Sequence, residues 1–231
     1  MQLFVGLGNP GPTHARQRHN IGFMALDAIA DWNNATPWRA KFQGEIAEAR
    51  LEAGKVLLLK PLTFMNLSGQ SVGEAARFYG IPTEDVTVFH DELDLAPGKL
   101  RVKRGGGHAG HNGLRSMHQH IGAEYARVRL GIGHPGHKDR VAGYVLHAFS
   151  QEERGWLEPL IDAVAREAGH LASKDDAGFM NAVARRLQPA KAEKPAKPAA
   201  KPPAAEAETA RSDTPASASP FAALRGLLPR R

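Results

Sequence analysis

The chain contains no cysteine among its 231 residues. This absence excludes a disulfide framework, a thiolate nucleophile and zinc or iron–sulfur centres that are held by cysteine. It also fits a reducing compartment. The hydrophobic content of 42% is ordinary, so a chain of this length can fold around one sizeable core without such cross-links.

Long apolar runs are absent as well. No stretch approaches the roughly 20 apolar residues that a membrane-spanning helix needs. The first residues, Met1–Gly6, lack the basic segment and the long apolar core of a secretory signal. We therefore expect a cytoplasmic location and no membrane partner.

The net positive charge is small in the part of the chain that we expect to fold. The formal net charge is +6, but the segment from Gln188 onward holds eight cations and four anions, which leaves only +2 for the rest. A mildly basic body is compatible with a nucleic-acid partner and does not by itself identify one.

The composition changes abruptly near Leu187. The segment beyond it is rich in Ala, Pro and Lys and has almost no large apolar residue before Phe221. Such a segment cannot bury enough surface to offset its ordering entropy, so we predict one folded domain over residues 1–187 and a disordered tail over 188–231. Leu224, Leu227 and Leu228 follow Phe221 at near-helical spacing, which leaves a weak docking peptide as the alternative to a merely solubilising tail.

Strand and helix patterns alternate before the tail. This alternation predicts a single α/β domain, with a mixed, twisted central sheet flanked by helices. Strands are expected at 3–7, 45–51, 56–59, 86–89, 100–103 and 126–132, and helices at 20–32, 69–79, 112–121, 151–170 and 176–187.

The first strand ends in a turn that satisfies the G-x-G-x-x-G pattern, from Gly6 to Gly11. The context of a dinucleotide site is missing, because Pro10 interrupts the turn and Asp31 lies in a predicted helix rather than after a second strand. What the turn supplies is Asn9, whose amide can both donate and accept hydrogen bonds.

Two further segments place chemistry beside predicted elements. His19 precedes the first helix, and Asp91 directly follows a buried strand. A histidine near its reference pKa of about 6.5 can act as a general base when a carboxylate fixes its tautomer. The alternatives are a packed or capping histidine and an acid that merely ends a strand.

A glycine-rich loop from Gly105 to Gly113 follows three cations, Arg101, Lys103 and Arg104. Exposed backbone N–H groups, a helix N-terminus and Lys or Arg side chains suit an anion such as phosphate. An alternative reading takes zinc ligands from a different set of side chains: His90, Asp91, His108 and His111. The spacing of these four does not match a known zinc pattern.

A third segment, Lys60–Gly69, places Phe64 and Met65 beside Asn66 ahead of a predicted helix. Ser68 lacks the G-x-S-x-G elbow of a nucleophile.

Taken together, these segments resemble bacterial peptidyl-tRNA hydrolases. The matching stretches follow the family's order and spacing between Met1 and Leu187, and the tail lies outside the resemblance. They are Gly6–Gly11, Arg18–Asn20, Phe64–Gly69, His90–Asp94, Gly105–Gly113 and Leu130–Gly136.

The resemblance implies an enzyme that hydrolyses the ester between peptide and tRNA and so recycles tRNA from peptides released prematurely by the ribosome. It implies neither a metal or other cofactor nor a covalent intermediate. His19 would be the general base that activates water, and Asp91 would orient it. The family also leads us to expect a monomer.

The resemblance further implies contacts to substrate. Asn9 would contact the peptide beside the ester, and Phe64, Asn66 and Asn112 would hold the 3′ end and the peptide, with Asn66 or Asn112 as the oxyanion donor. Lys103 and Arg129 would bind phosphate at the 5′ end of the tRNA. Two positions depart from the family: His14 stands in place of the usual tyrosine, where it can still stack or hydrogen-bond to substrate, and Gln17 stands in place of a frequent threonine.

Two other classes of function remain open from the residues. One is a metallohydrolase that uses the four zinc candidates named above. The other is a non-catalytic RNA-binding module that holds phosphate with Lys103, Arg104 and Arg129.

Overall fold

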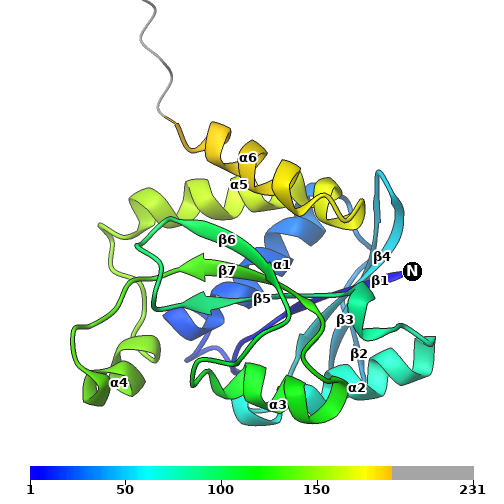
Figure 1. The fold of residues 1–231 in the computed structure, drawn as a ribbon, viewed down its shortest axis with the longest axis horizontal. Coiled ribbons are helices and arrows are strands. Elements are labelled where there is room, and N and C mark those ends of the chain that lie inside the picture. The colour runs from blue at the N-terminus through cyan, green and yellow to red at the C-terminus, as the bar shows by residue number, and fades with distance from the viewer. Residues whose placement is uncertain (189–231) are drawn as a thin grey trace, which may run out of the picture. The chain divides into compact units, whose positions relative to one another are not determined.

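The computed structural model describes residues 1–188, so the predicted tail beyond Gln188 lies outside the described residues. Seven strands form one sheet in the order β2-β3-β4-β1-β5-β7-β6 (Figure 1). Their bounds are β1 Gln2–Gly6, β2 Arg39–Lys41, β3 Gly44–Leu51, β4 Gly54–Pro61, β5 Val86–Glu92, β6 Leu100–Arg104 and β7 Ala126–Gly131.

The sheet is mixed, as predicted. Its centre is parallel, because β1 pairs in parallel with β4 and β5, and β5 with β7. Both margins are antiparallel, formed by β2 with β3, β3 with β4, and β6 with β7. The carboxyl ends of β1, β5 and β7 therefore meet at one edge, which is where ligands bind in open α/β sheets.

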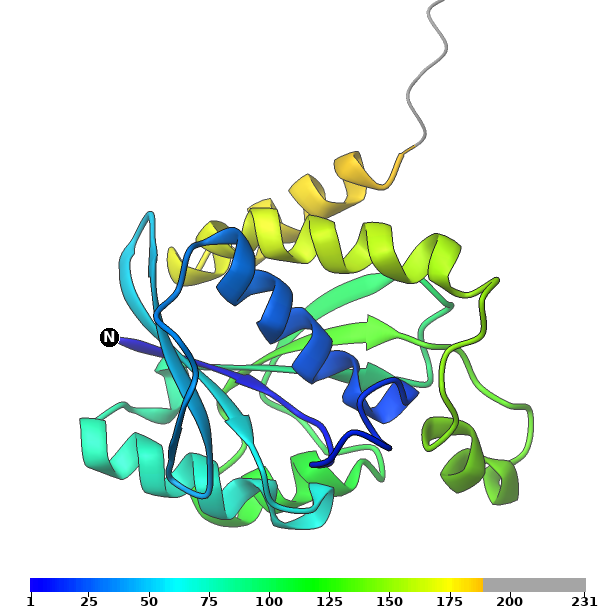
Figure 2. The same cartoon turned by 180° about the vertical axis from the view of Figure 1, so that it is seen from behind.

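Helices cover both faces of the sheet (Figure 2). On one face α1, α5 and α6 pack with the inward side chain of Phe4, and on the other α2 and α3 pack with Leu3 and Val5. This alternation along β1 follows from the two-residue side-chain period of a strand. The helices are α1 Ile21–Trp32, α2 Ser68–Tyr79, α3 Asn112–Ile121, α4 Val141–Val145, α5 Arg154–Ala172 and α6 Asp176–Arg186, with short 3-10 turns η1 Arg18–Asn20, η2 Met65–Leu67, η3 Thr83–Asp85 and η4 Lys138–Arg140.

Glycine lets α1 begin directly against the sheet. A Cβ atom at Gly22 would lie 2.3 Å from the carbonyl oxygen of Phe89 in β5, and one at Gly6 would lie 2.4 Å from the carbonyl oxygen of Gly22. Such distances leave no room for a side chain at either position. The first turn of α1, with η1 just before it, is therefore held close to the end of β5.

The predicted elements are all present, with shifts of a few residues at their ends. The largest difference at a strand concerns β5, which continues through His90, Asp91 and Glu92 instead of ending before them. Two further elements, β2 and α4, are short and were not predicted from the sequence. No helix within residues 1–188 is both long and apolar enough to cross a membrane.

Candidate active site

Asp91 lies between two histidines at the carboxyl end of β5. Its Oδ1 atom is 2.9 Å from Nδ1 of His19 in η1 and 3.0 Å from Nε2 of His111 before α3. Asp91 is 4% exposed and His19 is 9% exposed. The structure thus brings together the predicted base and its predicted acid, and adds a second histidine. We call His19, Asp91 and His111 the trio.

The hydrogen bonds fix how His111 donates. Its Nδ1 atom accepts from the backbone N–H groups of Gly113 and Leu114 at the start of α3, so this nitrogen carries no proton. The proton of the neutral ring is then on Nε2, which donates to Asp91. His111 therefore serves as the N-cap of α3 and as a donor to the carboxylate at the same time.

The charges within the trio are interdependent. Burial raises the pKa of Asp91, but the two neighbouring histidines outweigh it and hold that pKa well below its usual value. Burial likewise lowers the pKa of His19, but the charge and hydrogen bond of Asp91 outweigh it and leave that pKa raised. Asp91 is therefore ionised at neutral pH, and a proton on His19 is stabilised.

His90 precedes Asp91 in β5 but lies outside the trio. Its Nδ1 atom bonds to the carbonyl oxygen of Asp91, and its Nε2 atom is buried without a partner among the described residues. Burial, followed by the nearby His111, lowers the pKa of His90 to about 3. His90 is neutral across the physiological range.

Asn9 is held in place from both sides. Asn20 accepts from the backbone N–H of Asn9 and donates to its carbonyl oxygen, while the Oδ1 atom of Asn9 accepts from the backbone N–H of Met65. Asn20 is the N-cap residue of α1, but its side chain makes these bonds instead of capping the helix. The Asn9 amide thus joins the turn after β1 to η2.

Cations gather on one face of the β6–β7 pair. The register places Lys103 opposite Arg127 and Arg101 opposite Arg129, so all four side chains point the same way. Like charges directly across a strand pair destabilise it. The charge of Arg129 is offset by Glu92, because the Oε2 atom of Glu92 lies 2.7 Å from the Nε atom of Arg129. Within residues 1–188, no ion pair involves Lys103 or Arg127.

Arg127 is the most buried of these cations, at 4% exposure. Its Nη1 atom donates to the carbonyl oxygen of Gly107, while Nε and Nη2 have no partner among the described residues. A Cβ atom at Gly106 would lie 3.0 Å from Nη2 of Arg127 and 3.1 Å from Nζ of Lys103. The glycine-rich loop, Lys103 and Arg127 therefore enclose unsatisfied donors suited to an anion.

A cavity of about 540 Å³ joins the trio to these cations. Of the predicted site residues, five line it: His19, Asp91, Lys103, Asn112 and Arg129. Two residues that the sequence analysis did not assign to the enzyme mechanism line it as well, namely His111 and Arg127. The signals for them were the position of His111 just before a helix and the two-residue spacing of Arg127 and Arg129 along one strand.

The other predicted residues lie outside this cavity. Phe64 is 64% exposed beside η2, and Asn66 is also exposed there. Nδ1 of His14 lies 2.8 Å from the carbonyl oxygen of Pro10, within its own turn. Their predicted contacts with substrate remain predictions.

The alternative sets are not assembled as the sequence suggested. Within residues 1–188, the group whose potential metal-ligand atoms lie within 4.8 Å of one another is His19, Asp91 and His111, so His90 and His108 do not belong to it. Arg104, part of the alternative phosphate set, instead forms a two-point ion pair with Asp176 in α6.

Comparison with known proteins gives one consistent result. Residues 3–193 match the family model of peptidyl-tRNA hydrolase. The chain is 67% identical over 189 residues to the peptidyl-tRNA hydrolase of Ruegeria pomeroyi, covering 82% of this chain and 79% of that protein. It is 61% identical over 225 residues to that of Dinoroseobacter shibae, covering 92% and 96%. The crystal structure of peptidyl-tRNA hydrolase from Acinetobacter baumannii matches with a TM-score of 0.75 and 42% identity, covering 79% of this chain and 94% of that one.

Proposed function

The chain belongs to the peptidyl-tRNA hydrolase family, and on that premise we propose that the trio carries out the family's reaction, with His19 as the general base. The reaction itself, hydrolysis of the ester between peptide and tRNA, follows from the family. The observation that supports the assignment is the buried His19–Asp91 hydrogen bond at the wall of the cavity.

The tautomer of His19 suits this role. With Nδ1 donating to Asp91, the lone pair of the neutral ring is on Nε2, which makes no hydrogen bond to any residue between 1 and 188. This nitrogen takes a proton from water as the water oxygen attacks the ester carbon. Asp91 stabilises the imidazolium that forms, and His111 holds Asp91 in place.

Return of the proton to the leaving group completes the reaction. The tetrahedral intermediate expels the ribose oxygen, and His19 returns the proton to it, so that a free acid and a free tRNA leave. A general base supplies about 10²–10⁴-fold in rate, and an ester needs no stronger activation. Of the two predicted oxyanion donors, Asn112 is favoured over Asn66 because it lines the cavity.

Phosphate contacts are proposed for the cations at the other end of the cavity. Lys103 and Arg129 keep their predicted roles, and Arg127 joins them because its guanidinium has two unpaired nitrogens. These contacts add affinity without reading sequence, as an enzyme that accepts every tRNA requires.

The remaining predictions stay with this proposal. Asn9 and Phe64 are proposed to contact the peptide and the 3′ end, and His14 to contact substrate. Residues 1–187 are proposed as the catalytic domain of a monomer that acts in the cytoplasm. Size-exclusion chromatography with light scattering checks the monomer.

The decisive assay measures release of N-acetyl-amino acid from N-acetyl-aminoacyl-tRNA. We expect His19→Ala to lower kcat by about 10²–10⁴-fold. The matched control is His170→Ala, because Nδ1 of His170 lies 3.0 Å from Asp175 in a similar pair outside the cavity. This control should keep wild-type turnover.

A zinc chelator such as phenanthroline is added in excess Mg²⁺, so that the tRNA keeps its fold. Wild-type turnover should not change. Loss of activity with the chelator would move the chemistry to a metal at the trio. Full activity in His19→Ala would overturn the proposed base.

A further inference from the structure

One wall of the cavity is a weakly packed helix. Val141, Ala142 and Val145 of α4 line the same cavity as the trio. Only Val145 of the five residues in α4 is buried, and the elements that α4 mainly contacts are η1 and η4. A short helix with so few buried contacts has little stability of its own. Something outside α4 must hold this wall in position.

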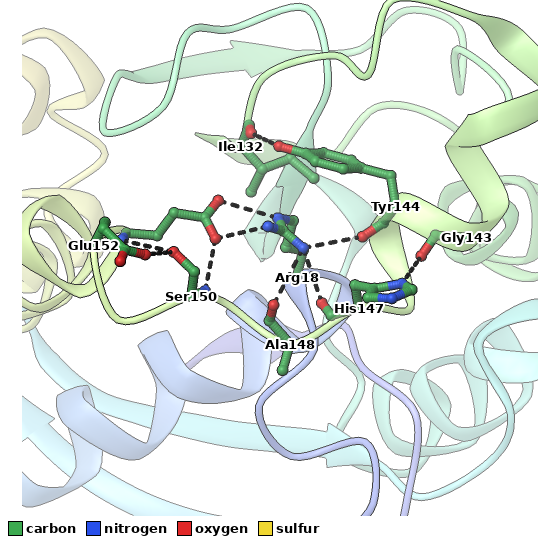
Figure 3. A network of polar contacts seen from close by, with 9 residues as sticks. Arg18, Ile132, Gly143, Tyr144, His147, Ala148, Ser150 and Glu152 are labelled. Atoms are coloured by element: carbon green, nitrogen blue, oxygen red, sulfur yellow. Dashed lines mark hydrogen bonds and ion pairs between the residues drawn. The ribbon is translucent and has the colours of Figure 1, made fainter.

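Arg18 makes that connection (Figure 3). It is buried at 9% exposure and directly precedes His19 in η1. Its Nη1 atom donates toward three carbonyl oxygens that follow or end α4, those of Tyr144, His147 and Ala148, at 3.2–3.3 Å. Tyr144 belongs to the last turn of α4, and His147 and Ala148 lie in the segment directly after it, so Arg18 ties the end of α4 and this segment to η1.

The other side of the guanidinium is held by Glu153 at the start of α5. Nε lies 3.2 Å from Oε1 of Glu153, and Nη2 lies 2.6 Å from Oε2. Paired N–H donors on one carboxylate form the strongest common geometry of an ion pair. The ring of Tyr144 stacks on the guanidinium at 4.3 Å, and its hydroxyl donates to the carbonyl oxygen of Ile132 beyond β7.

Backbone contacts reinforce the same connection. The backbone N–H of Arg18 donates to the carbonyl oxygen of His147, and that of Phe149 donates to the carbonyl oxygen of Arg16. The segment after α4 thus runs beside the segment that carries His19. Displacing one of them displaces the other.

From this geometry we propose that Arg18 is a positioning residue for the reaction, which fixes the α4 wall of the cavity relative to the neighbouring His19. The base and the residue that anchors the wall are consecutive in the chain, so this guanidinium, together with the backbone bonds beside it, sets the spacing between the nucleophilic water and the bound acyl group. This inference rests on the proposed role of His19.

Lysine at position 18 would keep the charge and lose the geometry. A single ammonium cannot pair at two points with Glu153 while reaching the carbonyls after α4. A shift of about 1 Å at a reacting pair can cost up to 10²-fold, so we expect Arg18→Lys to lower kcat/KM by about 10- to 100-fold, through both a higher KM and a lower kcat. The acid limb of the pH profile should also shift, because a displaced His19 interacts more weakly with the carboxylate of Asp91.

A second variant guards against loss of folding. Glu153→Gln keeps the shape of the side chain and removes the charge of the pair. We expect a smaller loss of kcat/KM in the same direction. The double variant should lose less than the two single losses multiplied together, because both changes break one interaction.

The matched control is Arg166→Lys in α5. Arg166 also pairs with a carboxylate, that of Asp162, and stacks on an aromatic ring, that of Trp32, outside the cavity. Its kcat/KM and pH profile should equal those of the wild type. Thermal melting of every variant separates loss of fold from loss of position.

The outcomes distinguish this inference from the proposed function. If Arg18→Lys and Glu153→Gln stay within about twofold of wild-type kcat/KM with an unmoved acid limb, the positioning role is overturned and Arg18 only stabilises the fold. If His19→Ala retains activity, the proposed function fails whatever Arg18 does. Both the proposed function and the positioning role of Arg18 are supported if His19→Ala loses activity and Arg18→Lys lowers kcat/KM and shifts the acid limb of the pH profile.

Discussion

The two ends of the cavity are built on opposite electrostatic principles. At one end the carboxylate of Asp91 is matched by two hydrogen-bond donors, on His19 and His111, and is almost fully buried. At the other end Lys103 and Arg127 face each other without a carboxylate partner among residues 1–188. The first end is complete in itself, and the second has unsatisfied donors that suit an anion.

The two arrangements use binding energy at different stages of the reaction. A preorganised charge pair costs no rearrangement when charge develops in a transition state, so it belongs at the reacting bond. Unpaired cations on neighbouring strands destabilise the free protein and gain when a phosphate arrives. Changes at the first end should therefore reduce kcat, and changes at the second should raise KM.

At the first end, His111→Asn removes the hydrogen bond to Asp91 without unfolding α3. Asparagine is a good N-cap, so the helix start is kept, but its side chain is too short to remain the donor to Asp91. A hydrogen bond to a charged group contributes about 1.5–3 kcal/mol, so kcat should fall by about tenfold or more while KM changes little. Steady-state kinetics on N-acetyl-aminoacyl-tRNA checks this.

His111→Ala serves as the comparison, because it removes both the cap and the donor. It should lose as much kcat as His111→Asn and in addition about 1 kcal/mol of stability. A His111→Asn variant with wild-type kcat would show that His19 and Asp91 work without the third member.

At the second end, Arg127→Met removes the charge of the guanidinium and keeps most of its buried volume. KM should rise by about tenfold, and the salt dependence of binding should weaken by about one phosphate contact. Arg129→Met should have a smaller effect, because Glu92 already neutralises part of that guanidinium. Titration of tRNA binding against salt concentration measures both.

Arg50→Met is the control for this pair of variants, since Arg50 is an exposed cation on β3, which the sheet order places on the opposite side of the sheet from β6. Binding and its salt slope should stay at wild-type values. A lowered kcat with unchanged KM in Arg127→Met would contradict the division between the two ends.

Much of the fold follows from local sequence patterns. The strands of the core alternate or run apolar, as in Leu3–Val5 and Val86–Phe89, and these predictions are confirmed. The β2 strand escaped prediction because it is short and exposed, and α4 escaped it because five residues are too few to establish a helical period. Their positions depend on tertiary contacts such as that of Arg18 with the carbonyls after α4.

The same limit applies to the candidate site. His19 and Asp91 stood at the ends of predicted elements, and the structure brings them together. His111, the second histidine beside Asp91, lies in a glycine-rich loop. The spacing of residues in such a loop does not predict which way a side chain points. The cross-strand pairing of Lys103 with Arg127 depends on the register of β6 and β7, which the sequence does not specify.

The role of His19 as the general base is tested by the pH dependence of kcat/KM, measured beside an NMR titration of the His19 ring. A general base must be neutral, and Asp91 raises the pKa of His19, so activity should rise with pH through a midpoint above 6.5 that coincides with the titration of His19. In Asp91→Asn that midpoint should fall, because burial remains and the stabilising charge is gone. An acid limb that does not follow the His19 titration in either protein would contradict His19 as the base.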